Sequence, residues 1–318
     1  MERWRARKVV IIGAGAVGST FAYALAQSGT ADEIVLTDVD QNLVQGQVLD
    51  LAHGLPFYPN VQIGVGGAHD YRDAHVIVIT AGSKQRPGES RLDLLQRNAR
   101  IVESIMDEIQ AQGSQAVVVV VSNPVDVLTY VAHRRVSWPR GRVIGSGTVL
   151  DSARLRYLLS QHCGVDVHNV HAYVLGEHGD SQFAAWSMSH IAGMRFDDYC
   201  QICGQCEDWQ EERRKIAETV RTSAYHIIDY KGATCFAVGQ ALVRIVSAIV
   251  RNEKSVLPVS VVLDGEYGLY EVCLSVPAIV GEAGVERILH SDLSPSERAA
   301  LERSADILKQ AIAQLSAG

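Results

Sequence analysis

The stretch that decides the fold is Val9-Val10-Ile11-Ile12-Gly13-Ala14-Gly15-Ala16-Val17-Gly18. Its four consecutive apolar residues predict a buried strand, and the apolar residues after it predict a helix. The glycines between them have the spacing Gly-x-Gly-x-x-Gly, which brings a pyrophosphate close to a helix N-terminus. Asp38 follows Gly18 by 38 − 18 = 20 positions, just after a second apolar run. A carboxylate there binds a ribose diol and repels a 2′-phosphate, so the sequence predicts an NAD site.

The same segment also fits a secretion signal. Basic residues at positions 3, 5, 7 and 8 precede the apolar run, and Ala-x-Ala spacings follow it. Cleavage near Ala26 would destroy the unit formed by the glycine turn and Asp38. We therefore interpret the segment as part of the fold and expect a cytoplasmic protein. The six cysteines in 318 residues are no disulfide framework, and free thiols fit a reducing compartment.

Composition excludes several classes of protein. Hydrophobic residues make up 47% of the chain and charged residues 20%, which is typical of a globular protein and not of a disordered one. The net charge is −7, so we expect no nucleic-acid partner. We expect no membrane association either. The length suggests two lobes.

Short apolar runs alternate with helical patterns in the first half of the chain. The runs are Val9–Ile12, Ile34–Leu36, Val76–Ile79, Val117–Val121 and Val143–Ile144. This alternation predicts an α/β fold with a Rossmann-type, doubly wound parallel sheet. Ligands of such sheets bind beyond the carboxyl ends of the strands. The residues expected to bind the dinucleotide are Gly13, Gly15, Ala16, Val17, Gly18, Asp38, Thr80, Ala81, Gly82, Ser122 and Asn123.

The pattern changes after about residue 146. We predict an NAD-binding domain over residues 1–145 and a mixed α+β catalytic domain over 146–318. A helix near 234–252 is expected to pack back on the first domain. Residues 256–263 and 269–274 are predicted to be antiparallel strands around a turn at Asp264-Gly265. Ser294-Pro295-Ser296-Glu297 predicts a capping box at the start of the last helix.

Five local motifs together resemble the lactate/malate dehydrogenase family, and the resemblance runs essentially end to end. The similarity is greatest to the bacterial lactate enzymes of that family. The motifs are Gln85-Arg86-Pro87-Gly88-Glu89-Ser90-Arg91, Ser122-Asn123-Pro124-Val125-Asp126, Asp151-Ser152-Ala153-Arg154, Gly176-Glu177-His178-Gly179-Asp180-Ser181 and Lys231-Gly232-Ala233-Thr234.

The resemblance implies a reversible hydride transfer between NADH and pyruvate, giving (S)-lactate and NAD. His178 would be the proton donor and acceptor, and Asp151 would orient it and favour its protonated form. Arg154 would bind the substrate carboxylate with two hydrogen bonds. Arg91, on a mobile loop, would close over the substrate and polarise its carbonyl. Asn123 would help to position the substrate.

The resemblance also places the substrate-discriminating residue at Gln85. Malate dehydrogenases have arginine there, which pairs with the second carboxylate of oxaloacetate. A neutral glutamine would leave that carboxylate unpaired, so pyruvate is favoured, and Thr234 would complete a small pocket. Malate dehydrogenase stays the alternative, because a shift of one residue would bring Arg86 into the pocket.

Regulation and assembly are expected from the resemblance alone. Arg156 and His171 lie where allosteric bacterial members bind fructose 1,6-bisphosphate between subunits, and the family implies a homotetramer, a dimer of dimers. Both residues also fit an ordinary structural role.

Cys200, Cys203 and Cys206 have the spacing of metal ligands, but no fourth ligand is evident. We expect no metal, and the cysteines are either an ordinary surface segment or a redox-sensitive cluster. Two other classes stay open: an NAD-dependent glycosidase, which would not need these motifs, and a non-catalytic NAD-binding protein.

Overall fold

The computed structural model describes residues 6–83, 88–204 and 207–316. Its α-helices are α1 (Ala16–Ser28), α2 (Gln41–His53), α3 (Arg91–Ala111), α4 (Val125–Arg135), α5 (Val149–Cys163), α6 (Phe196–Cys203), α7 (Trp209–Lys231), α8 (Phe236–Val250) and α9 (Pro295–Ser316). The strands of the large sheet are β1 (Lys8–Ile12), β2 (Glu33–Thr37), β3 (Gln62–Val65), β4 (Val76–Ile79), β5 (Val117–Val120), β6 (Val143–Gly145), β12 (Ser255–Asp264), β13 (Tyr270–Gly281) and β14 (Gly284–Ile288). Short strands β7 (Val170–His171), β8 (Val174–Leu175), β9 (Phe183–Ala184), β10 (His190–Ile191) and β11 (Met194–Arg195) lie outside it.

The nine-stranded sheet has the order β14-β13-β12-β6-β5-β4-β1-β2-β3. The six strands from β6 to β3 are parallel, and the order 3-2-1-4-5-6 is that of a dinucleotide-binding fold. Every residue of β1, β4, β5 and β6 is buried, as the continuous apolar runs predict. The predicted fold class is thus confirmed. Strand β3 was not predicted, because its residues are half-exposed and its sequence has no apolar run.

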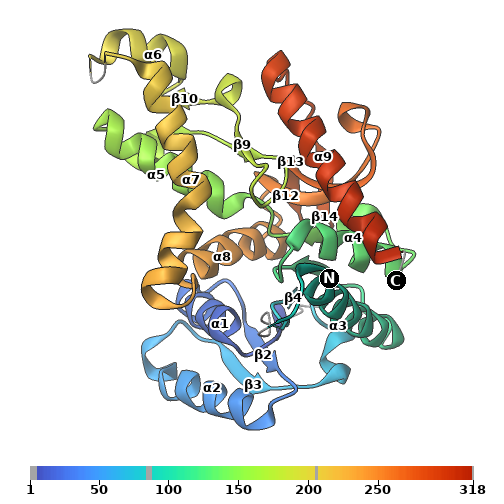
Figure 1. Cartoon of the computed structure of the whole chain (residues 1–318). Helices are drawn as coiled ribbons and strands as arrows, with labels where there is room; N and C mark the ends of the chain where they lie inside the picture. The colour runs from blue at the N-terminus through green and yellow to red at the C-terminus, as the bar shows by residue number, and fades with distance from the viewer. Residues whose placement is uncertain (1–5, 84–87, 205–206, 317–318) are drawn as a thin grey trace, which may run out of the picture.

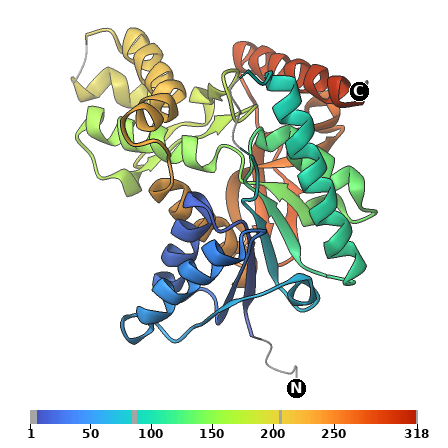
Figure 2. The same cartoon turned by 60° about the horizontal axis from the view of Figure 1, so that its bottom comes forward.

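Helices cover both faces of this sheet. The crossovers put α1 and α2 on one face, and α3 and α4 lie on the other, where α9 packs against them. Figure 2 shows the sheet between these two layers. Both layers are required because a parallel sheet has two apolar faces to bury.

The predicted antiparallel strands β12 and β13 do not form a sheet of their own. Strand β12 pairs with β6 through Ser260 and Gly145, so β12, β13 and β14 extend the parallel sheet. The sequence predicts the strands themselves from their apolar runs. It carries no signal for the edge to which they attach.

The second lobe has an apolar core of its own. Helices α5, α6 and α7 pack with the short strands around buried side chains such as Leu155, Leu159, Val170 and Val220. Figure 1 shows this lobe above the helices α1 and α2.

Helix α8 bridges the two lobes. It follows α7 in the chain and packs against α1, where Gly239 lies so close to Thr20 that an added Cβ would be 3.3 Å from the Thr20 carbonyl oxygen. The site described below lies where these helices meet.

The last helix begins as its sequence predicts. The Ser294 N–H donates to Glu297 Oε2 (2.8 Å), and the Glu297 N–H donates to Ser294 Oγ (3.3 Å), which is a capping box. Within the described residues, no helix combines the length and the apolar character that a membrane span requires.

Candidate active site

The glycine turn between β1 and α1 has a different physical requirement at each glycine. Gly13 has a φ of 108°, which only glycine adopts easily. A Cβ on Gly18 would lie 1.9 Å from the Gly13 carbonyl oxygen, so Gly18 allows the helix to approach the strand. Gly15 has no atom within 4 Å of the place of a Cβ, and no side chain caps the helix there. The N-terminus of α1 is thus open to an anion.

Neighbouring strands fix the position of this turn. The Thr80 hydroxyl, at the end of β4, donates to the carbonyl oxygens of Ile12 (3.1 Å) and Gly13 (2.9 Å). The Ala14 N–H donates to Asp38 Oδ2 (2.6 Å), so the carboxylate after β2 lies beside the turn and is partly exposed. Ser122 contacts the next loop through a hydrogen bond to the Ala81 carbonyl oxygen. An uncapped helix, an approach free of side chains and an adjacent carboxylate fit the pyrophosphate and ribose of NAD.

The second lobe contributes a histidine and a carboxylate to the site. His178 Nδ1 is 2.6 Å from Asp151 Oδ2, and Asp151 is 2% exposed in the first turn of α5. Arg154, one turn further on, donates from Nη1 to Asp151 Oδ1 (2.9 Å). One buried carboxylate therefore joins an imidazole and a guanidinium.

These contacts change the pKa values of both partners. Burial by itself lowers the pKa of His178, but the hydrogen bond and charge of Asp151 outweigh burial and raise it. Burial by itself raises the pKa of Asp151, but the charge of His178 and its hydrogen bond, with those of Arg154, lower it. The arrangement therefore favours a protonated imidazole beside an ionised carboxylate.

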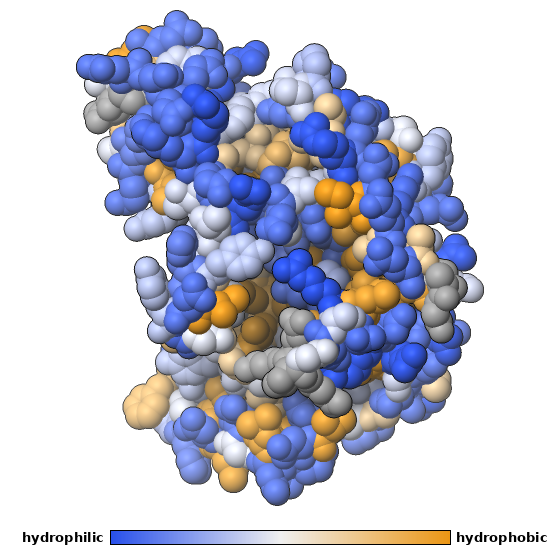
Figure 3. Space-filling model, in the orientation of Figure 1, coloured by the Kyte–Doolittle hydropathy of each residue, from blue (hydrophilic) through white to orange (hydrophobic). Residues whose placement is uncertain are grey.

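The predicted substrate residues meet in one cavity. His178, Arg154, Asn123 and Thr234 line a space of about 170 Å³, and Val17 of the glycine turn lines it too. They come from five segments of the chain, which only the fold brings together. Figure 3 shows the molecular surface hollowed between the two lobes, with apolar residues inside the hollow.

The apolar walls of this cavity were not predicted. They are formed by Leu150 of α5, Ala224 and Ile228 of α7, and Val238, Ala241 and Leu242 of α8, together with Val121. Ser146 and Gly147 also line the cavity, at the carboxyl end of a strand, where ligands of such sheets are expected. The sequence predicts the helices, but their apolar residues have the same spacing as residues that pack in a hydrophobic core. The pattern therefore does not indicate which of them line a cavity. The His178 N–H also donates to Asp126 Oδ2 (2.7 Å), a contact with no sequence signal beyond the motif that contains Asp126.

Arg91 is not among the residues that line the cavity. Arg91 is the exposed first residue of α3, within electrostatic reach of Tyr225 of α7. The N-cap residue of this helix is Ser90, which forms a capping box with Asp93. Gln85 lies outside the described residues, as does Arg86, so the predicted specificity loop has no geometry here.

Arg156 and His171 line a separate cavity of about 410 Å³. The Arg156 Nε donates to the Val170 carbonyl oxygen (2.8 Å), and His171 is exposed. Tyr173, Gln240 and Arg244 line the same cavity, which therefore carries cationic and polar groups from three segments.

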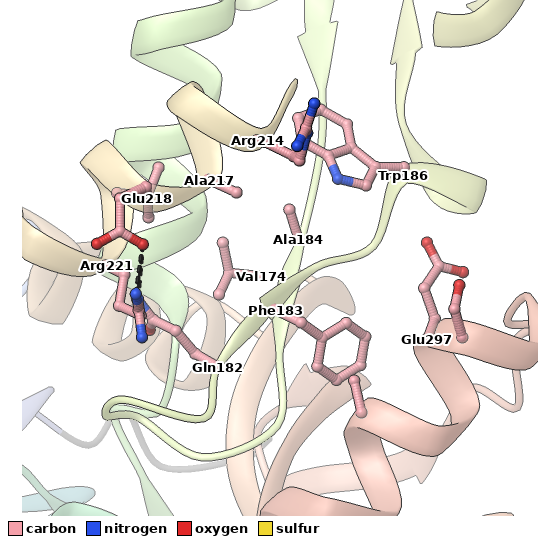
Figure 4. Close-up of a pocket in the computed structure, with 13 residues that line it drawn as sticks. Val174, Gln182, Phe183, Ala184, Trp186, Arg214, Ala217, Glu218, Arg221 and Glu297 are labelled. Atoms are coloured by element: carbon pink, nitrogen blue, oxygen red, sulfur yellow. Dashed lines mark hydrogen bonds and ion pairs between the residues drawn. The ribbon is translucent and has the colours of Figure 1, made fainter. Parts of the chain in front are cut away.

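A further cavity of about 450 Å³ contains none of the predicted residues. It lies between α7, β9 and α9, and Trp186 and Phe183 form part of its apolar wall (Figure 4). Its two arginines each pair with a glutamate one turn away, Arg221 with Glu218 and Arg214 with Glu211.

The cysteine run falls on and after α6. Cys200 is buried and Cys203 half-buried in this helix, and Cys206 lies outside the described residues. Across residues 6–83, 88–204 and 207–316, no group of three or more His, Cys, Asp or Glu side chains is placed to hold a metal ion.

A dinucleotide-binding lobe beside a cavity that holds a histidine, its buried aspartate partner and an arginine defines the class of NAD-dependent dehydrogenases. Comparison with known proteins identifies the family. Residues 7–145 match the model described as lactate/malate dehydrogenase, NAD binding domain, and residues 148–317 match its alpha/beta C-terminal domain. The chain belongs to the lactate/malate dehydrogenase family, so the predicted resemblance is confirmed, and the first match supports NAD as its cofactor.

Individual relatives agree with this assignment. An L-lactate dehydrogenase of Treponema denticola is 58% identical over 311 residues, covering 97% of this chain and 98% of the relative. One of Acetivibrio thermocellus is 50% identical over 309 residues, covering 97% of each chain. The crystal structure of a lactate dehydrogenase from a deep-sea metagenome library is 42% identical, with a TM-score of 0.96, and covers 98% of this chain and all of that one.

Substitutions in the glycine turn should separate folding from cofactor binding. We expect Gly18→Ala to lower the free energy of unfolding by about 2–3 kcal/mol, because its Cβ meets backbone that cannot move freely. Gly15→Ala should change it by less than about 1 kcal/mol. We expect it to weaken NADH binding at least about tenfold, because the methyl group occupies the approach to the helix N-terminus. Urea unfolding and NADH fluorescence titration measure the two effects. NADH binding by Gly15→Ala with the affinity of the unmodified protein would contradict this account of the turn.

Proposed function

We propose that this chain is an NAD-dependent L-lactate dehydrogenase that interconverts pyruvate and (S)-lactate. The observation that carries the proposal is the cavity in which His178, bound to Asp151, faces the same space as Arg154, Asn123 and Thr234. The names of the relatives support the same activity.

The proposed chemistry assigns one task to each side chain. Bound NADH supplies the hydride that reaches the carbonyl carbon of pyruvate. His178 gives its proton to the carbonyl oxygen, which becomes the hydroxyl of lactate, and it takes a proton back in the reverse direction. Asp151 stabilises the imidazolium from behind. Arg154 binds the substrate carboxylate, and Asn123 orients the carbonyl.

Two further assignments concern the rest of the substrate. Arg91 polarises the carbonyl when it is brought over the cavity, which excludes water. Gln85 and Thr234 lie around the methyl group of pyruvate. Neither side chain offers a charge to a second carboxylate, so this part of the pocket favours a methyl group. The assignment of Gln85 rests on the sequence motif alone.

The substrate should be decided by a comparison of two acids. We expect kcat/KM for pyruvate to exceed that for oxaloacetate by at least about a hundredfold, because oxaloacetate would bury an unpaired carboxylate beside Gln85. The measurement is the loss of NADH absorbance with each acid. Preference for oxaloacetate would mean that Arg86, and not Gln85, contacts the substrate and pairs with its second carboxylate. Absence of NADH oxidation with either acid would contradict the dehydrogenase assignment and favour a non-catalytic NAD-binding protein.

The pH dependence should depend on Asp151. Because Asp151 raises the pKa of His178, the imidazole keeps its proton to higher pH, and pyruvate reduction is lost only as the pH rises through that raised pKa. We therefore expect Asp151→Asn to move the alkaline loss of pyruvate reduction to lower pH and to reduce kcat by at least about tenfold. Steady-state rates from pH 5.5 to 9.5 measure both effects.

The chain offers a matched control. Asp166 contacts His168 at 2.7 Å in a second His–Asp pair, but both side chains are exposed and neither residue lines the cavity. Asp166→Asn should leave the pH profile of activity unchanged. An Asp151→Asn profile that coincides with that of the unmodified protein would contradict the role of Asp151.

We also propose a homotetrameric cytoplasmic enzyme that fructose 1,6-bisphosphate activates. Large apolar side chains that are strongly exposed on the single chain support association: Phe57 is 87%, Tyr230 86% and Phe236 72% exposed. The shared cavity of Arg156 and His171 supports a site for a phosphate-bearing activator, because both groups donate hydrogen bonds to phosphate oxygens.

Activation should depend on the imidazole of His171, because it donates a hydrogen bond to a phosphate oxygen. The measurement is the ratio of rates with and without fructose 1,6-bisphosphate. His171→Ala should lose most of the activation. His168→Ala is the control, since that exposed histidine lies outside the cavity. Activation of His171→Ala equal to that of the unmodified protein would contradict the assignment.

A further inference from the structure

Asp126 is a fully buried carboxylate to which the proposed chemistry gives no task. It is the second residue of α4, which follows β5 and the Asn123-Pro124 pair, and it is 2% exposed. A carboxylate near a helix N-terminus is favoured by the helix dipole, but a complete burial of charge is costly. A neutral side chain would pack here at a lower cost in free energy, so the presence of a carboxylate at position 126 requires an explanation.

Its two oxygens bind groups from two distant segments. Oδ2 accepts the backbone N–H of His178 (2.7 Å), and Oδ1 accepts the hydroxyl of Ser260 on β12 (2.6 Å). Ser260 is itself fully buried. Asp126 thus links α4, the loop of His178 and the strand at which the second half of the chain joins the sheet.

Among the described residues, the charged groups that act on Asp126 are His178 and Glu177. The hydrogen-bond donors of Asp126 are an amide and a hydroxyl, and Cys273 of β13 and Glu177 lie near enough to interact electrostatically. Burial raises the pKa of Asp126 to about 6, although the hydrogen bonds from Ser260 and His178 oppose this rise. Both of its oxygens accept a hydrogen bond, which favours the ionised carboxylate, and His178 is the titratable cation that it faces.

Three charged groups from two helices act on His178. From α5, Asp151 contacts the ring and favours its charge, whereas the positive charge of Arg154 opposes it. From α4, Asp126 contacts the backbone, and its negative charge favours the protonated ring. Asp151 is thus shared between His178 and Arg154, while the cation that acts on Asp126 is His178.

We propose that Asp126 is a positioning residue for His178, fixing the histidine backbone relative to Asn123 and favouring the protonated imidazole through its buried negative charge. The proposal rests on the proposed function, in which His178 is the proton donor. Asn123 precedes Asp126 by three positions in the chain, and it lines the same cavity as His178. One carboxylate therefore sets the spacing between the residue that orients the carbonyl and the residue that protonates it.

Asp126→Asn is the informative substitution. Asparagine keeps the shape: its Oδ1 can accept the His178 N–H while its amide donates to the Ser260 hydroxyl, so only the charge is lost. We expect kcat for pyruvate reduction to fall about tenfold. We also expect the ratio of the rate at pH 8.5 to that at pH 6.5 to fall at least about threefold, because His178 loses its proton at lower pH. A purely structural role would reduce both rates by the same factor.

Asp70→Asn is the matched control. Asp70 also accepts a backbone N–H, that of Gly67 (2.9 Å), and it binds Lys8 at the amino end of β1, away from the cavity. This variant should keep the rate ratio of the unmodified protein. An Asp126→Asn ratio that also stays unchanged would overturn the electrostatic part of the proposal.

Two further measurements keep the proposal testable. Ser260→Ala retains the charge of Asp126 but removes one of its hydrogen bonds, so we expect kcat to fall about threefold with the pH ratio unchanged. An unchanged kcat would overturn the positioning part. The titration of His178 by NMR in histidine-labelled protein, assigned with His178→Gln, does not need turnover. Its midpoint should fall in Asp126→Asn even if pyruvate proves not to be the substrate, which separates this proposal from the proposed function.

Discussion

The pairing of β6 with β12 is the contact on which the arrangement of the site depends. Ser260 of β12 faces Gly145 of β6, and this antiparallel pair joins the second half of the chain to the parallel sheet. A Cβ on Gly145 would lie 2.9 Å from the Ser260 Cβ, and one on Gly147 would lie 2.6 Å from the Ser260 nitrogen. Glycine is thus required at both positions for β12 to approach. The carboxyl edge of the sheet, where the cofactor residues lie, is thereby held against the segment that carries His178.

The charges of the groups that act directly on His178 balance when its imidazole is protonated. Asp126 and Asp151 bring two negative charges, and Arg154 brings one positive charge. A protonated His178 completes neutrality in a partly buried space, where unbalanced charge costs more than in water. The carboxylate of a 2-oxo acid adds one more negative charge on binding, which increases the preference for the imidazolium. Substrate binding and proton retention are therefore coupled by electrostatics and do not require a movement of the protein.

The sequence predicts what depends on neighbouring residues. The glycine spacing, the buried strands and the capping box at Ser294 are local patterns, and the structure contains them. His178 and Asp151 are 27 positions apart, and only the family motifs connect them before the fold is known. The bond between Asp126 and Ser260 spans 134 positions and has no local pattern, because an isolated serine in a buried strand looks like any other. The same limit explains why the faces of α7 and α8 that line the cavity were not predicted.

Arg91 differs from the other site residues in what fixes its position. Asn123 follows a strand of the large sheet, His178 follows β8, and Asp151 and Arg154 lie on α5, whereas Arg91 begins α3 at a helix cap. The Ser90 N–H donates to Asp93 Oδ2 (3.2 Å), and the Asp93 N–H donates to Ser90 Oγ (3.1 Å). Glu89 is bound to Arg97 at 2.8 Å. These contacts hold the backbone on both sides of Arg91. A backbone movement would first have to break the cap, which contributes about 1 kcal/mol to the helix. Rotation of the long Arg91 side chain is therefore a less costly way to redirect its guanidinium than a movement of the backbone.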